Sequence, residues 1–533
     1  MRIRSTTVLW MGLAAALGAC SQSAGPEPDP SGGCVTDLSC AFDQECDGTG
    51  CGPAEPGLYP NIQTASALFR DHIDDNELAW RATHYDLMIG QARADEIRAF
   101  NPRARIFDYV NTRYLVLDVA AYLWAQAHGY DNEDFYLHYQ EDTAVPTWET
   151  TVLVPGFPPG IVPGYNPGGG GNPASATTRA QSRVPGFASA SGTSTPWYLA
   201  NVDHPGYRRF LRDHIEGLLD GTYWFSGFAT GPIDGVLCDN AIFYSAFNEG
   251  VLNHSAEYYG VPMTDNHPYP VAYETLYPEL AEEVLGQTGR TADLMPNYGH
   301  VFFLNYPNRS AIGVQATTPW IWGEVWVTYT GVWSPTTGGN RCVTYERDYL
   351  NAVSEIVEQT KAGGRRILGA RDLASGTAGT DRGKLFTLGL YYLVHNSHTF
   401  YMYETVGGHQ YAAPISSWAW NPAVTYDIGQ PDVIPNGALD FQGHANTKEH
   451  YVFASGSDPF NPALTYRVLA RRFTNALVLV KMLPDGSVTD DRSLTTHALD
   501  GSYAVLQADG SLGAVVTQAQ IRNNEALILI SLD

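Results

Sequence analysis

Charged side chains are scarce in this 533-residue sequence, and basic ones are scarcer still. Asp, Glu, Lys and Arg make up 16% of the residues, against roughly 25% in an ordinary globular protein. The chain has 31 Lys and Arg but 56 Asp and Glu, which gives a formal net charge of −25. Phosphate backbones and anionic lipid headgroups are bound by clustered basic residues. The composition therefore argues against docking on anionic lipid, and we expect no nucleic-acid partner.

Several familiar motifs are also missing. No glycine-rich nucleotide loop follows a predicted strand, and the sequence has neither a G-x-S-x-G elbow nor an H-E-x-x-H pair. No spacing resembles an EF-hand loop. The 15 histidines are scattered, and His395 and His398 have only the spacing of a weak metal pair, so a structural role is favoured for each. We therefore expect no cofactor and no metal.

What the sequence does contain is a large apolar and aromatic fraction. Hydrophobic residues make up 44% of the chain and aromatic residues 12%, with 32 Tyr, 12 Trp and 53 Gly. So much apolar material excludes global disorder, and the length suits two or three domains. Few charges with many rings are typical of extracytoplasmic proteins that meet neutral polar ligands, of which sugars are the obvious class.

The first 20 residues have the pattern of an export signal. Arg2 and Arg4 precede a short apolar run from Val8 to Leu17, which is too short for a comfortable membrane span. The run ends in Leu17-Gly18-Ala19-Cys20, which resembles a bacterial lipobox, with Cys20 as the lipidated residue. A plain cleavable signal peptide is the alternative. No later apolar run is long enough for a transmembrane helix, so we expect an exported protein that is lipid-anchored in the bacterial cell envelope, at the outer membrane or cell surface.

Residues 21–56 have the composition of a flexible spacer, rich in Gly, Pro, Ser and Asp. The spacer holds Cys34, Cys40, Cys46 and Cys51, which predict either two disulfides or a zinc site. Export and the lack of paired C-x-x-C units favour disulfides, but the sequence leaves their connectivity open. Cys238 and Cys342 are expected to be unpaired core residues.

Residues 57–411 alternate short apolar runs with helical patterns, as βα units do. The eight predicted strands are Leu58–Ile62, Tyr85–Ile89, Arg105–Val110, Ile233–Cys238, Ala292–Met295, Trp320–Val325, Arg366–Ala370 and Thr399–Tyr403. Apolar residues at helical spacing predict helices over 207–219 and 349–357. This pattern favours an α/β fold, a (β/α)8 TIM barrel, over a doubly wound open sheet. A Gly/Pro/Ser-rich insertion at 155–196 follows the third strand. It is expected to border the cleft passively, with a lid as the alternative.

Residues 412–533 predict a second domain, an antiparallel β-sandwich-like unit. Short apolar or alternating runs at 466–469, 476–480, 503–506 and 526–530 are separated by turn signals such as Pro484-Asp485-Gly486. The main role expected of this domain is packing against the barrel, with sugar binding as a lesser alternative.

Candidate catalytic residues follow from the ends of the predicted barrel strands, where active sites of such barrels lie. The segment Ile233 to Asn240 is an apolar strand that ends in Asp239 and Asn240. Asp239 is the functional candidate, with a strand-end cap as the structural alternative, and Asn240 would touch the substrate. Asp234, at the start of the strand, is expected to bond nearby backbone N–H groups.

The second candidate is Glu324, which stands alone among Trp320, Trp322 and Trp326. Burial beside rings raises a carboxyl pKa, as a general acid requires, and tryptophan faces suit sugar rings. The structural alternative is a wall residue paired with an arginine. Two carboxylates that face each other across a barrel mouth are what glycosidic-bond cleavage needs. Weaker candidates at other strand ends are Asp108, Asn111, Asn297, Tyr298, Asp372 and Glu404.

Several segments of the chain are similar to a known family when taken in their order. Tyr85–Ile89 and Asn101–Tyr109 resemble the second and third strands of barrel glycoside hydrolases of the hypothetical glycosyl hydrolase family fifteen type. Two segments, Asp134–His138 and His204–Arg208, resemble the segments before the fourth strand of these proteins, and Asp234–Asn240 resembles that strand itself. The segment Tyr466–Val480 resembles the start of their C-terminal β-domain. The resemblance implies a barrel hydrolase acting on polysaccharide. Cys238 departs mildly from the pattern.

Two functions are therefore weighed. The first is a monomeric, lipid-anchored glycoside hydrolase that cleaves O-glycosidic bonds of a polysaccharide or oligosaccharide with Asp239 and Glu324. The second is a non-catalytic glycan-binding surface lipoprotein on the same scaffold, because fold does not fix function. Two facing carboxyl groups in an open cleft favour the enzyme, whereas a filled mouth or a Glu324–arginine pair favours the binding protein.

Overall fold

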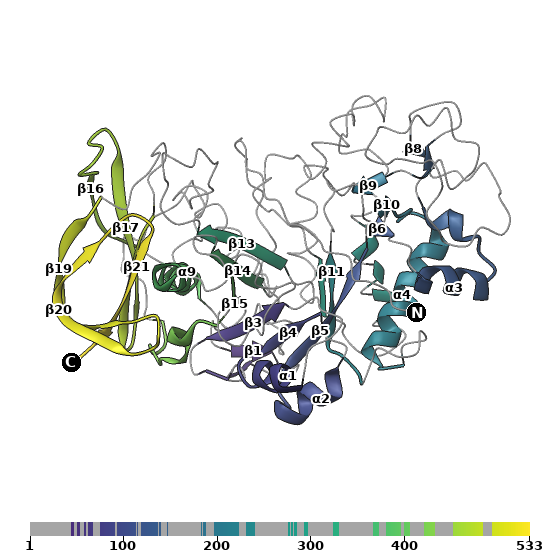
Figure 1. The fold of residues 1–533 in the computed structure, drawn as a ribbon, viewed down its shortest axis with the longest axis horizontal. Helices are drawn as coiled ribbons and strands as arrows, with labels where there is room; N and C mark the ends of the chain where they lie inside the picture. Colours follow the sequence, from purple (N-terminus) through teal and green to yellow (C-terminus); the bar gives the residue numbers. More distant parts are fainter. Residues whose placement is uncertain are drawn as a thin grey trace, which may run out of the picture.

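The fold is described from a computed structural model of the chain (Figure 1). It describes residues 44–46, 51–53, 58–59, 62–67, 75–90, 93–112, 114–115, 119–136, 138–139, 146–147, 183, 185–187, 197–222, 231–239, 275–277, 279–280, 282–284, 293–296, 323–329, 366–372, 380–395, 399–405, 420–431, 451–482 and 493–532. The export signal, Cys20, Cys34, Cys40 and Cys342 lie outside these residues.

Eight parallel strands form the central sheet. In chain order they are β3 (Gln63–Ala67), β4 (Leu87–Ile89), β5 (Arg105–Asn111), β11 (Gly235–Asp239), β12 (Asp293–Pro296), β13 (Gly323–Tyr329), β14 (Arg366–Asp372) and β15 (Thr399–Thr405). Their order in the sheet is β12-β11-β5-β4-β3-β15-β14-β13, so the last strand pairs with the first. This is the strand order of a (β/α)8 barrel. Among the described residues no ladder joins β12 to β13, so the ring is open between these two strands. The predicted eight-strand order is confirmed, but the ring is not closed.

Two predicted strands are misplaced. The first was expected at Leu58–Ile62, but Tyr59 and Ile62 form only an isolated bridge, and the strand begins at Gln63. Pro60 lies inside the expected run and has no N–H to donate to a ladder. The sixth strand was expected at Trp320–Val325 but spans Gly323–Tyr329, which moves its C-terminal end past Glu324.

Helices lie between the strands, as the alternation predicted. They are α1 (Asp75–Ala82), α2 (Ala94–Phe100), α3 (Val119–Ala127), α4 (Pro205–Leu219) and α9 (Asp381–Val394), with helical turns at 275–284 and short 3-10 turns η2 (Asn132–Phe135) and η8 (Pro422–Thr425). The periodic face predicted for α4 is buried. His204 caps its N-terminus by accepting a hydrogen bond from the Gly206 N–H, and Pro205 occupies its first turn. The helix predicted over 349–357 lies outside the described residues.

The two faces of the parallel sheet form two separate apolar cores. Phe107, Leu237, Ile367 and Phe400 belong to the cluster inside the curved sheet. Ile106, Val110 and Val236 belong to a larger cluster with α1 to α4. Alternate residues of β5 and β11 therefore face the barrel interior and the helical layer in turn, as strand geometry requires.

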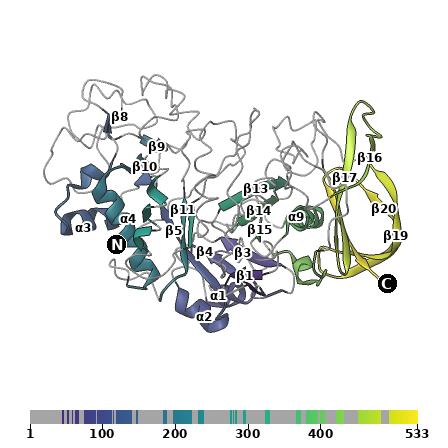
Figure 2. The same cartoon turned by 180° about the vertical axis from the view of Figure 1, so that it is seen from behind.

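A separate unit is inserted between β5 and α4. Strands β6 (Tyr114–Leu115), β10 (Trp197–Leu199) and β9 (Pro185–Phe187) form one small antiparallel sheet, and β7 (His138–Tyr139) pairs with β8 (Pro146–Thr147). The insertion predicted at 155–196 lies outside the described residues apart from 183 and 185–187, so its bounds stay a prediction. It lies at one end of the molecule and the C-terminal sheet at the other (Figures 1 and 2).

The C-terminal domain is one six-stranded antiparallel sheet. Its strands are β16 (Tyr451–Ser457), β17 (Thr465–Phe473), β18 (Ala476–Lys481), β21 (Glu525–Ser531), β19 (Thr495–Leu506) and β20 (Leu512–Ile521), in that order across the sheet. Strands β17, β18 and β21 separate β16 from β19 in the sheet, yet the rings of Phe453 on β16 and His497 on β19 lie only 6.2 Å apart. This short distance shows that the sheet curls. Residues of its inner face pack together as a core of their own. The predicted antiparallel domain is confirmed, although a single curled sheet takes the place of two packed sheets.

Helix α9 packs between the barrel and the C-terminal sheet. Its residues share one apolar cluster with Tyr401 of β15 and with Val480 and Ile528 of the C-terminal sheet. Arg382, in the first turn of α9, donates hydrogen bonds to the carbonyl oxygens of Asn523 and Asn524. At the other end of the helix, Arg471 of β17 donates to the carbonyl oxygens of Tyr392 and His395. Both ends of α9 are therefore fixed to the C-terminal domain.

The spacer contributes one hairpin to the described residues. Strands β1 (Gln44–Cys46) and β2 (Cys51–Pro53) pair in antiparallel register, with Cys46 opposite Cys51. Within the described parts of the chain, no helix is both long enough and apolar enough to cross a membrane.

Candidate functional site

The C-terminal ends of the eight barrel strands define the candidate site. Because all eight strands are parallel, these ends meet at one edge of the curved sheet. Below that edge the interior is filled by side chains such as Phe107, Leu237 and Ile367, each less than 5% exposed. The base of the site is therefore closed and apolar, and polar groups above it would lie in a region of reduced dielectric constant.

Asn111 and Asp239 lie side by side at this edge. Both are the last residues of their strands, β5 and β11, and the ladder places them opposite each other. Asn111 comes four residues after Phe107, and Asp239 two residues after Leu237. Because alternate residues of a strand share one face, both positions lie on the same face as these interior core residues. The structure thus places the Asp239 backbone where the sequence predicted. Its side chain and Asn240 lie outside what the structure describes.

Asn111 is held by the residue below it. Its Nδ2 donates a hydrogen bond of 3.3 Å to the hydroxyl of Tyr109, and the ring of Tyr109 packs on the interior core. This contact fixes a half-buried amide at the rim, next to the backbone position of Asp239. A rim amide so placed can hydrogen-bond a hydroxyl-rich ligand.

Asp108 belongs to the opposite face of β5. It lies between Ile106 and Val110, which both pack in the helical layer, so it does not point into the barrel mouth. Burial raises the pKa of its carboxyl to about 6, while the hydrogen bond from the Tyr109 N–H opposes that rise. Asp108 shares the buried character of many catalytic acids but not their location.

Asp234 has the structural role predicted for it. Its Oδ2 accepts a 2.8 Å hydrogen bond from the backbone N–H of Ile106 and a 2.9 Å bond from Arg98 of α2. These contacts join the N-terminal end of β11 to β5 and α2. The expectation that this carboxylate bonds backbone N–H groups is therefore confirmed.

Glu324 does not lie at the end of its strand. It is the second residue of the seven-residue β13, in register with Ile367, whose side chain belongs to the fully buried interior core. Trp326 follows at the register of Gly369, while Trp320 and Trp322 lie outside the described residues. The expectation that Glu324 projects from a strand end rested on the misplaced sixth strand.

The strands opposite β11 carry further charged residues near their ends. In the sheet order, β5, β4 and β3 separate β11 from β15, so these two strands would face each other if the eight strands closed into a barrel. Glu404 is the sixth of the seven residues of β15 and pairs in register with Arg371 of β14. Asp372 is the last residue of β14. It is five residues after the interior residue Ile367, so its position lies on the opposite face of the strand. Asn297 and Tyr298 lie just beyond β12, outside the described residues.

Arg371 was missed by the sequence reasoning. The signal was present, because Arg371 is a lone basic residue that directly follows the apolar run of β14. Attention to carboxylates alone concealed it. Its register with Glu404 places a cationic and an acidic residue on neighbouring strands at the same rim.

The inserted unit is held together by contacts between distant parts of its chain. Tyr136 bridges to Ala200, and the Asn201 N–H donates to the carbonyl oxygen of Phe135. Arg183 forms a bidentate, buried ion pair with Glu133, and its guanidinium lies 3.9 Å from the centre of the Tyr136 ring. These contacts hold segments of the inserted unit together that lie up to about 65 residues apart in the sequence.

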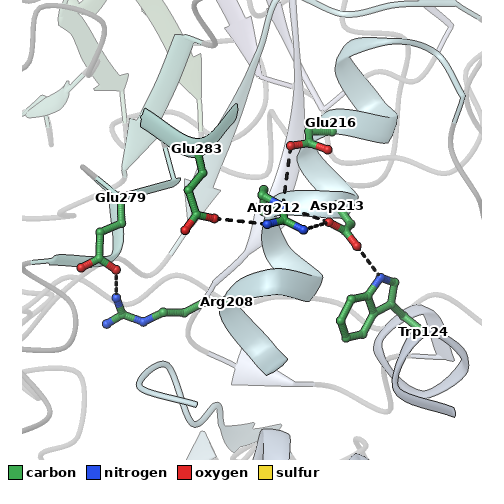
Figure 3. A network of polar contacts seen from close by, with 7 residues as sticks. All are labelled: Trp124, Arg208, Arg212, Asp213, Glu216, Glu279 and Glu283. Carbon is green, nitrogen blue, oxygen red and sulfur yellow. Dashed lines mark hydrogen bonds and ion pairs between the residues drawn. The ribbon is translucent and has the colours of Figure 1, made fainter. Parts of the chain in front are cut away.

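A charged network fixes the helices behind β11 (Figure 3). Arg212 of α4 bonds Asp213 at 2.6 Å and lies within 3.7 Å of Glu216 and 3.6 Å of Glu283. Asp213 also accepts a 3.1 Å hydrogen bond from the indole N–H of Trp124 on α3, and Arg208 pairs with Glu279. All these groups belong to helices outside the barrel, so the network positions α4 against its neighbours and contributes nothing to the mouth.

Of the two histidines favoured for structural roles, only His395 is among the described residues. His395 is buried at the C-terminal end of α9, and His398 lies outside the described residues. Burial, with a smaller contribution from nearby Arg471, lowers the pKa of His395 to about 3. Among the described residues, no three His, Cys, Asp or Glu side chains gather so as to hold a metal ion.

Comparisons with known proteins give weak likenesses. No protein-family model matches the chain, and no curated protein matches it. Solved structures similar to it include isomaltulose synthase from Erwinia rhapontici, with a TM-score of 0.41 at 10% identity, covering 88% of this chain and 98% of that one. Another is a mutant of MutB in complex with the substrate sucrose, with a TM-score of 0.44, 10% identity and the same coverage. Likeness of this degree is too weak to carry a role to any residue here, and the resemblance to the hypothetical glycosyl hydrolase family fifteen type stays a prediction.

Proposed function

We propose that the chain is a glycoside hydrolase that cleaves O-glycosidic bonds of a polysaccharide at the mouth of its barrel. The observation that carries the proposal is the pairing of Asn111 and Asp239 at the C-terminal edge of the sheet, above a closed apolar base. A carboxylate beside a fixed amide suits a group that attacks or supports a sugar cation while a neighbour binds a hydroxyl. Asp239 is proposed as the nucleophile or the base.

The second carboxyl group is assigned by position along the strands. Glu324 is the candidate from sequence, but the second position of β13 lies at the level of the buried core residue Ile367. Glu404 is near the end of β15 and would lie opposite Asp239 in a closed eight-stranded barrel. We therefore favour Glu404 as the general acid and retain Glu324 as its competitor. A carboxyl separation of about 5–5.5 Å would give retention and about 6.5–9.5 Å inversion.

The remaining candidates would line sugar subsites. Asn240, Asn297 and Tyr298 follow the ends of β11 and β12, and Asp372 ends β14. Trp320, Trp322 and Trp326 would offer aromatic faces to sugar rings. The alternative function, glycan binding without cleavage, uses the same subsites and needs no second carboxyl group.

The test is release of reducing sugar from a panel of polysaccharides, followed by Asp239→Asn on any active substrate. Loss of a catalytic carboxylate should reduce kcat by at least about a hundredfold with an unchanged melting temperature. The matched control is Asp234→Asn, the same substitution at the opposite end of the same strand, which should retain kcat in the folded protein. Glycan binding by the wild-type chain without any hydrolysis would support the binding protein instead.

A further inference from the structure

The hairpin in the spacer resolves a question that the spacing of its four cysteines leaves open. Four cysteines allow three disulfide connectivities. The antiparallel ladder of β1 and β2 pairs Gln44 with Pro53, Glu45 with Gly52 and Cys46 with Cys51. Cys46 and Cys51 are therefore directly opposite each other, on either side of a four-residue connection that contains Gly48 and Gly50.

This register meets the distance requirement of a disulfide. Directly opposed residues of an antiparallel pair have Cα atoms about 4.5–5.5 Å apart, and disulfides span Cα separations of about 4.4–6.8 Å. A bond between these two residues would need no rearrangement of the hairpin backbone. Either other connectivity would link both Cys46 and Cys51 to cysteines outside the hairpin, away from the residue opposite each in the ladder.

We propose that Cys46 and Cys51 form a disulfide across the β1–β2 hairpin, which leaves Cys34 and Cys40 to form the second bond. In each bond two thiols lose two protons and two electrons, and the S–S bond forms by exchange with a disulfide of an oxidising protein, which is reduced to its dithiol. The spacer is then two consecutive small loops, each closed on itself, rather than one interlocked knot. The proposal does not depend on the enzymatic function.

The sequence around the cysteines makes the connectivity directly measurable. Asp37, Asp43 and Asp47 each lie between two successive cysteines, and Asp29 and Asp71 flank the group. A protease that cleaves before aspartate therefore cuts the spacer into four peptides with one cysteine each. Digestion of the exported, full-length protein without reductant, after thiol alkylation in denaturant, should yield two linked pairs by mass spectrometry: Cys46 with Cys51, and Cys34 with Cys40.

Variants and an internal control sharpen this test. Cys46→Ser should free Cys51 for alkylation and leave the bond between Cys34 and Cys40 intact, and Cys34→Ser should free only Cys40. Cys238, a buried cysteine that forms no disulfide, should be alkylated in all samples once the protein is unfolded. A peptide linking either hairpin cysteine to Cys34 or Cys40 would overturn the proposal, as would four alkylated thiols or stoichiometric zinc released from the spacer.

Discussion

A buried neutral histidine makes the folded chain sensitive to acid. His395 is enclosed by Tyr391, Tyr392 and Phe473, and its Nδ1 finds no hydrogen-bond partner among the described residues. Its pKa is about 3 in the folded chain, against about 6.5 when unfolded. Between these two pH values the His395 ring is protonated in the unfolded chain but neutral in the folded chain. The contribution of His395 to the free energy of unfolding is therefore complete above pH 6.5 and is lost as the pH falls.

We predict that His395 lowers the free energy of unfolding as the pH falls from about 6.5 to about 4, against the opposite contribution of Asp108, whose pKa is raised to about 6, and that His395→Phe removes the His395 contribution. Phenylalanine keeps a ring in the aromatic surroundings but cannot take up a proton. The measurement is urea unfolding at a series of pH values. His214, whose pKa burial lowers to about 4, should account for part of the slope that remains. An identical slope in the His395→Phe variant would contradict the prediction.

The two candidate acids differ in what their removal should do. If Glu404 is the general acid, Glu404→Gln should lower kcat by at least about a hundredfold and remove the alkaline limb of the pH–rate profile. Glu324→Gln should leave kcat within about tenfold, because that position lies near the start of β13. Steady-state kinetics from acid to alkaline pH on one active substrate decides between them. The reverse pattern would restore the pair expected from sequence.

At the scale of single elements, Gly389 in the middle of α9 sets how closely the helix approaches the C-terminal sheet. A Cβ at this position would collide with the Cβ of Ala526 on β21 and come within 3.1 Å of Val480 Cγ2. We predict that Gly389→Ala destabilises the chain by about 1–3 kcal/mol, although alanine favours a helix by up to about 1 kcal/mol elsewhere. Thermal unfolding measures this, and the double variant Gly389→Ala with Ala526→Gly should recover much of the loss. A stabilised single variant would show that the packing is looser than described.

We expect the buried ion pair of Arg183 and Glu133 to stabilise the inserted unit. Removing one partner leaves the other charge buried without its ion pair, which typically costs about 3–5 kcal/mol. We therefore predict that Arg183→Met loosens the insertion and exposes it to limited proteolysis before the barrel unfolds. Joint replacement with Glu133→Gln should cost less than the sum of the two single changes. Equal proteolysis rates in wild type and Arg183→Met would show that this ion pair does not stabilise the inserted unit.

Sequence patterns identified the elements that have one apolar face. α4 was found because its buried residues recur at helical spacing, and β5 and β11 because apolar runs end in polar residues. The same approach misses α9, which has no polar stripe since the barrel and the C-terminal sheet cover both its sides. The start of β3 was missed because Asp86 accepts hydrogen bonds from the N–H groups of Leu58 and Thr64. That contact joins segments far apart in sequence, and no local pattern reveals it.

The candidate site was predictable to a similar degree. The strand-end position of Asp239 was predictable because a strand end is a local feature, and so was the position of Asp234, directly before the same strand. The position of Glu324 within its strand was not, since the aromatic run around it resembles a strand from Trp320 onward, whereas β13 spans Gly323–Tyr329. The opposition proposed for Glu404 and Asp239 depends on sheet order, which no local pattern contains.

At the scale of the whole molecule, the lipobox-like segment that ends in Cys20 bears on where the chain resides. We propose that Cys20 carries the lipid anchor, so Cys20→Ser should release the protein in soluble form or leave its signal unprocessed. Membrane fractionation with an antibody to the C-terminal domain measures this. The control is Cys34→Ser, which alters a nearby cysteine outside the lipobox and should stay membrane-bound. An unchanged membrane fraction for Cys20→Ser would contradict the anchor.

The pairing of the last barrel strand with the first imposes a waiting time on synthesis. β3 ends at Ala67, and its partner β15 is complete only at Thr405. At roughly 5–20 residues per second, the ribosome needs about 20–70 seconds to make the intervening chain. Wherever the chain folds, on the ribosome or after export, one edge of β3 can accept a strand from a neighbouring chain until β15 arrives. Expressed in the cytoplasm without residues 1–20, the chain should therefore give less folded protein when translation is slowed between these strands than when it is slowed after Thr405.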